Sequence, residues 1–243
     1  MALGKRIRNI ARYGVGDAAR ARKSADKLAK REATFESELW QREEGFAQRR
    51  YASYEAYLEH QVAKLDEIED RLLETEAEDL AEFTRRFGLC ERLRTCRSVL
   101  CLGARLGTEV QALLDLGHFA VGIDLNPGSG NAYVLKGDFH KLVFPEGSVD
   151  AVYTNTLDHV FDLGRVVGEV RRVLRPGGLF VADVLEGYGE GFTPGRYEST
   201  HWESKEALLA KVAELGQFGL IETRALGAHR RDVWTQAVFE KPL

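Results

Sequence analysis

Short apolar runs alternate with amphipathic stretches through the second half of this chain. The runs are rich in Val, Leu, Ile and aromatic residues, and they predict β-strands over 99–102, 119–123, 132–135, 150–155, 179–184, 220–226 and 233–240. Between them, apolar positions spaced three and four apart predict helices over 108–116, 163–174 and 205–215. Strands that alternate with helices indicate an α/β fold, in which helices cover both faces of a mostly parallel sheet.

The first part of the chain has a different pattern, which predicts helices alone. Between residues 17 and 87 there is no proline and one glycine, Gly45, while Ala, Glu, Arg, Lys and Leu dominate. We expect a break at Gly45 or at Ser53, which can cap a new helix. These patterns divide the chain into an N-terminal arm, a helical extension that forms a coiled coil or a helical hairpin, and an α/β domain, with bounds at 1–16, 17–90 and 91–243.

Apolar side chains recur at helical spacing from Tyr54 to Phe83, and aromatic side chains recur from Phe35 to Tyr57. The aromatic residues are expected to pack, either helix on helix or across the α/β domain. An apolar stripe left open along about seventy residues would be a large exposed patch for a monomer. The extension is therefore expected to form a homo-oligomer or to dock on the rest of the chain.

Glycines and acids follow the predicted strands at the positions where a nucleotide-like ligand would bind. Gly103 and Gly107 follow the first strand and let backbone approach a ligand closely. Asp124 ends the second strand, where a carboxylate can accept hydrogen bonds from both hydroxyls of a ribose. Asp138 follows the third strand, and an Arg-Pro-Gly-Gly sequence at 175–178 precedes the fifth. Ligands of open parallel sheets bind at this carboxyl edge.

As an ordered set, these motifs resemble the class I S-adenosylmethionine-dependent methyltransferases, and in particular the type 11 methyltransferase domains, over residues 97–240. The resemblance implies a Rossmann-like sheet whose last strand runs antiparallel between the fifth and sixth strands. It also implies S-adenosyl-L-methionine as the cofactor. The cofactor-binding residues that it implies are Gly103, Ala104, Arg105, Gly107, Asp124, Leu125, Asp138, Phe139 and Asn155.

Two residues depart from the pattern of this family. Cys101 stands where the family has an acidic residue that contacts the methionine amino group, and Arg105 stands where it has a glycine. The first change removes a carboxylate from the cofactor site, and the second adds bulk and positive charge beside a sulfonium ligand.

The residues after the fourth strand lie where the family places groups that face the transferred methyl. Because the ordinary pKa of histidine lies near neutrality, His159 is our candidate for the base that accepts a proton, while Asp158 could orient a base or a polar substrate. The alternative is that His159 has a structural role. His140, which follows the third strand, is a weaker candidate for the same base.

A long glycine-containing loop over 186–204 follows the fifth strand, and such loops are commonly lids or binding segments. Its aromatic residues could stack on a sugar or an aromatic ring, and Arg196 and His201 could meet an anion; alternatively, Tyr197 and Trp202 anchor the loop on the core. We expect methyl transfer to oxygen, with nitrogen as a second possibility, of a small molecule or glycan. Because the α/β domain has no continuous basic run, nucleic acid is an unlikely acceptor.

Composition fits a cytoplasmic protein. No apolar stretch approaches the roughly 18 residues that span a bilayer, and no signal-peptide pattern opens the chain. Cys90, Cys96 and Cys101 have no metal-binding spacing, so we expect reduced, buried thiols and no metal site.

Charge is distributed unevenly along the chain. Residues 1–31 contain ten Lys and Arg against two Asp, a net charge of +8, whereas residues 51–88 contain eleven acids against four bases, a net of −7. Leu3, Ile7, Ile10 and Ala11 fall on one helical face of the basic segment. This pattern predicts a reversible peripheral contact with an anionic inner membrane surface, or else pairing with the acidic segment.

Two other classes of protein compete with a methyltransferase. One is a catalytically inactive methyltransferase-like binding module, which Cys101 and Arg105 favour. The other is a nicotinamide-dependent oxidoreductase, which shares the ribose acid but has a fuller glycine motif than this chain.

Overall fold

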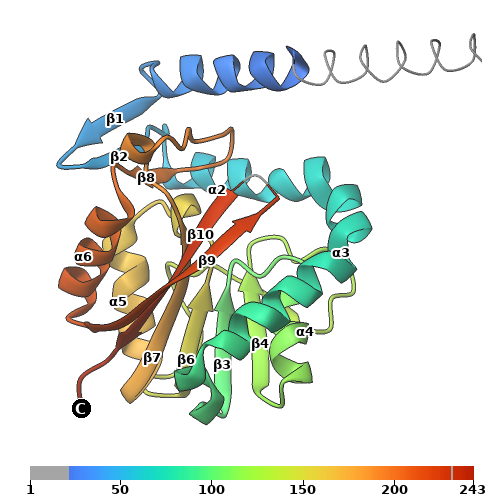
Figure 1. Ribbon diagram of the computed structural model, residues 1–243, viewed down its shortest axis with the longest axis vertical. Coiled ribbons are helices and arrows are strands. Elements are labelled where there is room, and N and C mark those ends of the chain that lie inside the picture. The colour runs from blue at the N-terminus through green and yellow to red at the C-terminus, as the bar shows by residue number, and fades with distance from the viewer. Residues whose placement is uncertain (1–21, 231) are drawn as a thin grey trace, which may run out of the picture.

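The computed structural model describes residues 22–230 and 232–243. Its centre is a seven-stranded sheet in the order β5-β4-β3-β6-β7-β10-β9 (Figure 1). The strands β3 to β7 are parallel, and β10 runs antiparallel between β7 and β9, which confirms the predicted topology. The strands are β3 (Ser98–Leu102), β4 (Phe119–Asp124), β5 (Val134–Lys136), β6 (Val149–Thr154), β7 (Leu174–Leu185), β9 (Gly219–His229) and β10 (Asp232–Glu240).

Helices cover both faces of the sheet. Since side chains alternate along a strand, Leu100 and Leu102 face one apolar core with α5 (Leu163–Val173) and α6 (Lys205–Gly216). Val99 and Cys101 face a second core with α4 (Thr108–Asp115). Asp162 and Ser204 cap α5 and α6 by accepting hydrogen bonds from Arg165 N and Ala207 N. All three helices lie where the apolar spacing predicts them.

The prediction of helix throughout residues 17–87 is wrong at residues 40–49, which form a β-hairpin. β1 (Trp40–Glu43) and β2 (Phe46–Arg49) are joined at Glu44 and Gly45, which both have positive φ, as a tight hairpin turn requires. β2 then pairs with β8 (Thr200–Trp202). The turn chemistry at Gly45 and the burial of Trp40 and Ala47 prevail over local helix propensity.

The remainder of the extension is helical. Residues 22–35 are helical, and α2 (Tyr54–Val62) and α3 (Lys64–Leu89) follow the hairpin. Ser53 caps α2 by accepting a hydrogen bond from Ala56 N, as predicted. Short 3₁₀ turns occupy Glu91–Thr95, Leu157–His159 and Tyr188–Glu190.

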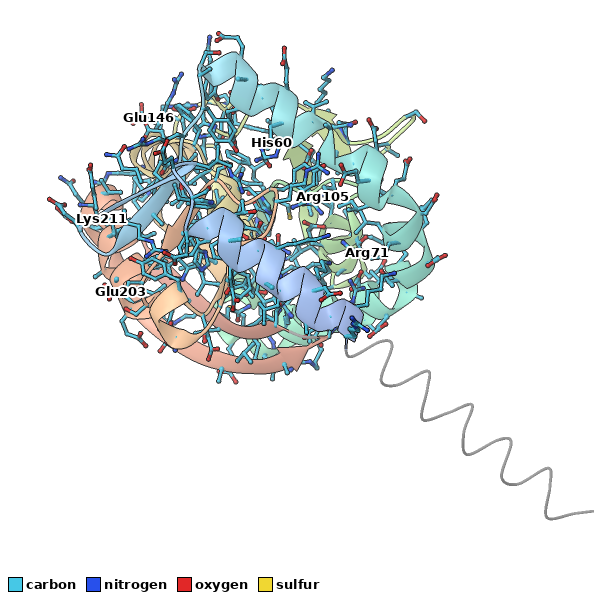
Figure 2. All side chains as sticks on the ribbon, turned by 90° about the horizontal axis from the view of Figure 1, so that it is seen from above. His60, Arg71, Arg105, Glu146, Glu203 and Lys211 are labelled. Carbon is cyan, nitrogen blue, oxygen red and sulfur yellow. The ribbon has the colours of Figure 1, made fainter. Side chains whose placement is uncertain are left out.

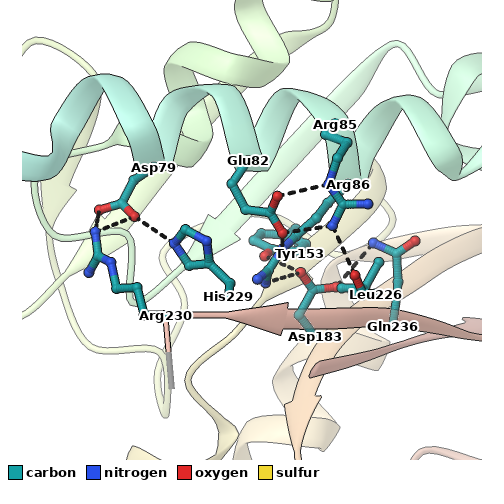
Figure 3. A network of polar contacts seen from close by, with 10 residues as sticks. All are labelled: Asp79, Glu82, Arg85, Arg86, Tyr153, Asp183, Leu226, His229, Arg230 and Gln236. Atoms are coloured by element: carbon teal, nitrogen blue, oxygen red, sulfur yellow. Dashed lines mark hydrogen bonds and ion pairs between the residues drawn. The ribbon is translucent and has the colours of Figure 1, made fainter. Parts of the chain in front are cut away.

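α3 docks along the sheet rather than extending away from it. Phe87 packs edge-on against Tyr153 of β6 and belongs to the same core as α4. Buried Arg86 donates to Asp183 of β7 at 3.1 Å, and Asp79 binds His229 and Arg230 at the end of β9 (Figure 3). The apolar stripe of the extension is therefore covered largely within one chain. Homo-oligomerisation stays a prediction.

The three cysteines are free and buried, as expected. Within the described residues, no helix is long and apolar enough to cross a membrane. The predicted arm at 1–16 and its apolar face from Leu3 to Ala11 lie outside the described residues.

Candidate functional site

The loop after β3 and the end of β4 form the floor of a small cavity of about 40 Å³. Both carboxylate oxygens of Asp124 accept backbone hydrogen bonds, from Arg105 N at 3.0 Å and from Asn126 N at 2.8 Å. Leu125 and Phe139 line the same cavity. The structure therefore brings Gly103, Arg105, Asp124, Leu125 and Phe139 together as the sequence predicts, although their roles toward a cofactor stay predictions.

The backbone of the glycine loop is left-handed at Gly103, Arg105 and Gly107, with φ values of 71°, 43° and 87°. A Cβ on Gly103 would lie 2.4 Å from the hydroxyl oxygen of Thr156, so the fold itself requires glycine there. Gly107 lies beneath Tyr133 and starts α4 rather than lining the cavity. Arg105 holds a backbone conformation that normally favours glycine.

α2 and the start of α3 form the roof of the small cavity. The sequence did not predict this contribution of the helical extension to the site. Tyr57, Gln61 and Lys64 line it from above. These residues lie three or four positions apart and so share one helical face. That spacing is visible in the sequence, but it does not indicate which part of the α/β domain the helical face meets.

Asp138 and His140 hold the α2 roof rather than line either cavity. Tyr54 of α2 donates to Asp138 Oδ2 at 2.5 Å, and Asp138 Oδ1 accepts from His140 Nδ1 at 2.9 Å. His140 Nε2 accepts from the backbone N–H groups of Phe161 and Asp162. With both ring nitrogens engaged in this way, His140 is a structural residue and not the base that was considered.

His159 lies between the small cavity and a larger one of about 840 Å³ and lines both. Its Nδ1 donates to the carbonyl of Tyr197 at 2.9 Å, so its Nε2 can accept from Lys64 Nζ at 2.7 Å. Asp158 Oδ2 lies 3.7 Å from the same Nε2. The structure thus joins His159 and Asp158 with Lys64, which the sequence did not single out.

Burial shifts the proton affinities of this group in different directions. Burial and the neighbouring Lys64 hold the pKa of His159 well below its usual value. Burial lowers the pKa of Lys64 to about 7 and raises that of Asp158 to about 7. The groups that titrate near neutrality are therefore Lys64 and Asp158 rather than His159.

The larger cavity lies between the helical segment 22–35, α3 and the carboxyl ends of the strands, and Figure 2 looks into this space from above. Ala104 and Asn155, both predicted site residues, line it, as do Phe192 and Arg196 of the long loop. Among the residues that the structure describes, ten Lys and Arg residues line it against seven Asp and Glu residues.

The long loop is mostly anchored. Trp202 is buried and donates to the carbonyl of Leu185 at 3.1 Å, and Tyr197 is 7% exposed, which favours the anchoring role. His201 is fully buried against Trp202 and Phe192, where burial lowers its pKa to about 3. The expectation that His201 meets an anion is therefore wrong. Arg196 is paired with Glu67 at 2.7 Å.

A carboxylate lies near Cys101, the position at which the family pattern has an acidic residue. Cys101 is buried, and Glu109 in the first turn of α4 lies close enough to act electrostatically on its thiol and on Arg105. Glu109 is 6% exposed and lines the larger cavity, and burial raises its pKa to about 8. A carboxyl group of α4 therefore acts electrostatically at Cys101, where the family pattern has an acid on the strand.

Residues 100–182 match the model of a family described as a methyltransferase domain. A sterol 24-C-methyltransferase of Neurospora crassa is 37% identical over 94 residues, which are 38% of this chain and 22% of that protein. A probable S-adenosylmethionine-dependent methyltransferase of Mycolicibacterium smegmatis is 27% identical over 129 residues, which are 49% of each protein. The chain thus spans half or less of the length of these curated relatives.

The fold is also that of solved methyltransferases. The structure of 1,6-didemethyltoxoflavin N1-methyltransferase from Burkholderia thailandensis, with bound S-adenosylhomocysteine, has a TM-score of 0.63 at 17% identity and covers 84% of this chain and 99% of its own. A possible histamine N-methyltransferase from Thermotoga maritima has a TM-score of 0.58 at 16% identity, over 76% of this chain and 99% of its own. Residues 100–182 thus match a methyltransferase domain, and the chain has the fold of these solved methyltransferases.

Proposed function

We propose that the protein transfers a methyl group from S-adenosylmethionine to a hydroxyl of a small molecule or glycan. The observation that carries this proposal is that two cavities meet at the carboxyl edge of the sheet. Gly103, Thr156, Lys64 and His159 line both the small cavity over Asp124 and the larger cavity beneath the helical segment 22–35. With the adenosine of a cofactor in the first cavity and an acceptor in the second, the methyl group and the acceptor would meet at these residues.

The residues of the small cavity fit the cofactor. The Asp124 carboxylate is fixed by two backbone N–H groups, and its remaining lone pairs are available to ribose hydroxyls. A volume of about 40 Å³ is far below the roughly 300 Å³ at which ligand pockets begin. We therefore expect the α2 roof to move when adenosine enters. When bound, the cofactor supplies a methyl group that is already activated on sulfur.

The chain's own contribution to the reaction is to hold the acceptor and to accept its proton. In our proposal the hydroxyl proton passes to the Lys64 amine, which is held by His159, with the His159 ring fixed by the Tyr197 carbonyl and Asp158 beside it. A neutral Lys64 amine is available near pH 7, because burial has lowered its pKa to about 7. In this proposal Lys64 accepts the proton, and His159 positions its amine.

The acceptor is argued from the cavity, because the relatives differ in chemistry. One relative is by name a sterol C-methyltransferase, and one structural neighbour is an N-methyltransferase. A proton acceptor at the junction favours a hydroxyl, which must lose a proton when it is methylated. A binding module without catalysis remains the alternative, and it predicts no cofactor binding.

Calorimetric titration with S-adenosylhomocysteine tests the proposal. The wild-type protein should bind the ligand, and Asp124→Ala should weaken binding by about 1.5–3 kcal/mol because a charge-assisted acceptor is lost. Asp115→Ala, which changes an exposed acid at the end of α4, is the matched control and should bind like the wild type. No binding by the wild type at millimolar ligand would favour the binding module.

A further inference from the structure

Glu109 carries a buried carboxyl group that lines the larger cavity and has few hydrogen-bond or ion-pair partners among the described residues. It belongs to the first turn of α4, lines the larger cavity together with Arg105, and acts electrostatically on Arg105 and Cys101. Within the described part of the chain, its only hydrogen-bond donor is its own backbone N–H, and it forms no ion pair within 4.0 Å. A buried carboxyl group in such a place is stable as the neutral acid until a cation arrives.

Two guanidinium groups lie in the same part of the cavity. Arg105 and Arg71 are close enough to repel each other electrostatically, and both line the cavity wall. Seen from above, they lie in the space between the helical segment 22–35 and α3 (Figure 2). Neither forms an ion pair within 4.0 Å among residues 22–230 and 232–243, and the acids that act electrostatically on Arg105 are Asp124, Glu109 and Asp158.

We infer that Glu109, Arg71 and Arg105 bind the α-amino-acid end of the cofactor, with Glu109 holding its ammonium group and the two arginines holding its carboxylate. This inference rests on the proposed function. An α-amino acid carries its ammonium and carboxylate groups on the same carbon atom. A site that binds both groups therefore needs an acidic and a basic side chain close together. Glu109 and Arg105 are such neighbours, and Arg71 adds a second guanidinium for bidentate recognition of a carboxylate.

The same arrangement gives a common explanation for both departures from the family pattern. Cys101 no longer supplies an acid from β3, and Glu109 supplies one from α4. Arg105 adds a positive charge, and its φ of 43° is tolerated in a loop whose backbone also donates to Asp124. The alternative is that the two arginines bind an anionic group of the acceptor. In that case, replacing Arg71 would leave the affinity for the cofactor unchanged.

The test compares three ligands by calorimetry: S-adenosylhomocysteine, its decarboxylated analogue, and 5′-methylthioadenosine, which lacks both charged groups. The proteins are the wild type, Arg71→Met, Glu109→Gln and, as a matched control, Arg92→Met, which removes an exposed arginine far from the cavity lining. Methylthioadenosine reports whether the adenosine site is intact in each variant, so a folding defect is recognised.

We expect the wild type to bind S-adenosylhomocysteine more tightly than the decarboxylated analogue. Arg71→Met should bind S-adenosylhomocysteine about ten- to hundredfold more weakly and lose most of that difference. Glu109→Gln should weaken both amine-bearing ligands and leave methylthioadenosine unchanged. Arg92→Met should match the wild type.

Equal affinities for S-adenosylhomocysteine in the wild type, Arg71→Met and Glu109→Gln would overturn the inference and leave the proposed function standing. So would equally tight wild-type binding of the decarboxylated analogue. Failure of the wild type to bind any of the three ligands would contradict both the inference and the proposed function.

Discussion

Single residues decide whether this carboxyl edge can hold a charged ligand. Glu109 is the clearest case, since its burial disfavours the charged form in the folded protein. Its pKa of about 8 lies above the ordinary value of 4.5, so the unfolded chain loses its proton first as pH rises. The contribution of neutral Glu109 to the free energy of unfolding is therefore fully present below about pH 4.5. It decreases as the pH rises from there to about 8.

Glu109→Gln should separate stability from ligand binding. The neutral amide removes the charge that the fold resists, so at pH 8 the variant should be more stable than the wild type by about 2–4 kcal/mol. At pH 4.5 the two should unfold at nearly the same denaturant concentration. Chemical denaturation at both pH values checks this prediction. Equal stability at pH 8 would show that Glu109 is already charged and stabilised in the fold.

Gly103 provides a second prediction at the residue scale. Its Cβ position lies 2.4 Å from the Thr156 hydroxyl oxygen, and its φ is 71°. Gly103→Ala should therefore lower the free energy of unfolding by about 2–4 kcal/mol, through both overpacking and backbone strain. Denaturant titration measures the loss.

Gly117→Ala is the control for that experiment, because Gly117 has a φ of 91° and no atom within 4 Å of its Cβ position. It should lose only about 1 kcal/mol from backbone strain. Similar losses in the two variants would mean that Thr156 yields to the added methyl group, and that Gly103 is dispensable for packing.

At the scale of elements, α3 connects the extension to the catalytic sheet. Arg86 is 3% exposed and donates to Asp183, which also receives hydrogen bonds from Tyr153 and Gln236 (Figure 3). Glu82 binds the other side of the same guanidinium at 2.8 Å. This network fixes the height of α3 above β7 and so the position of Lys64 and Arg71 over the cavity.

Removing the arginine should destabilise the whole protein. Arg86→Met leaves the Asp183 carboxylate buried with neutral donors only, which should cost about 3–5 kcal/mol. Combining it with Asp183→Asn should restore a large part of that loss, because no buried charge is then left unpaired. Thermal unfolding of the single and double variants checks the coupling. Additive losses would show that the two residues act independently.

Across the whole molecule, the sequence predicts the sheet better than it predicts the extension. Strand and helix periods were clear over residues 97–240, and the glycine loop and Asp124 lie where the motifs place them. The hairpin at 40–49 was missed because its strands are only four residues long and because β2 pairs with β8, some 150 residues away. A pairing of that kind leaves little local signal.

The candidate site divides in the same way. Residues fixed by local motifs, such as Gly103 and Asp124, could be predicted, whereas Lys64 reaches the site only because α3 docks on the sheet. The role proposed for Glu109 also depends on the three-dimensional structure, since Glu109 lies eight positions after Cys101 and on a different element. Long-range packing, rather than any motif, completes the site.

The most direct test of the account is an experimental structure with S-adenosylhomocysteine bound. We predict ribose hydroxyls on the Asp124 carboxylate, a displaced α2 roof above the adenosine, and the α-amino-acid end between Glu109 and the guanidinium groups of Arg71 and Arg105. Ligand bound away from Asp124, or crystals that exclude it at millimolar concentration with α2 unmoved, would contradict the central claim that this edge of the sheet is a cofactor site.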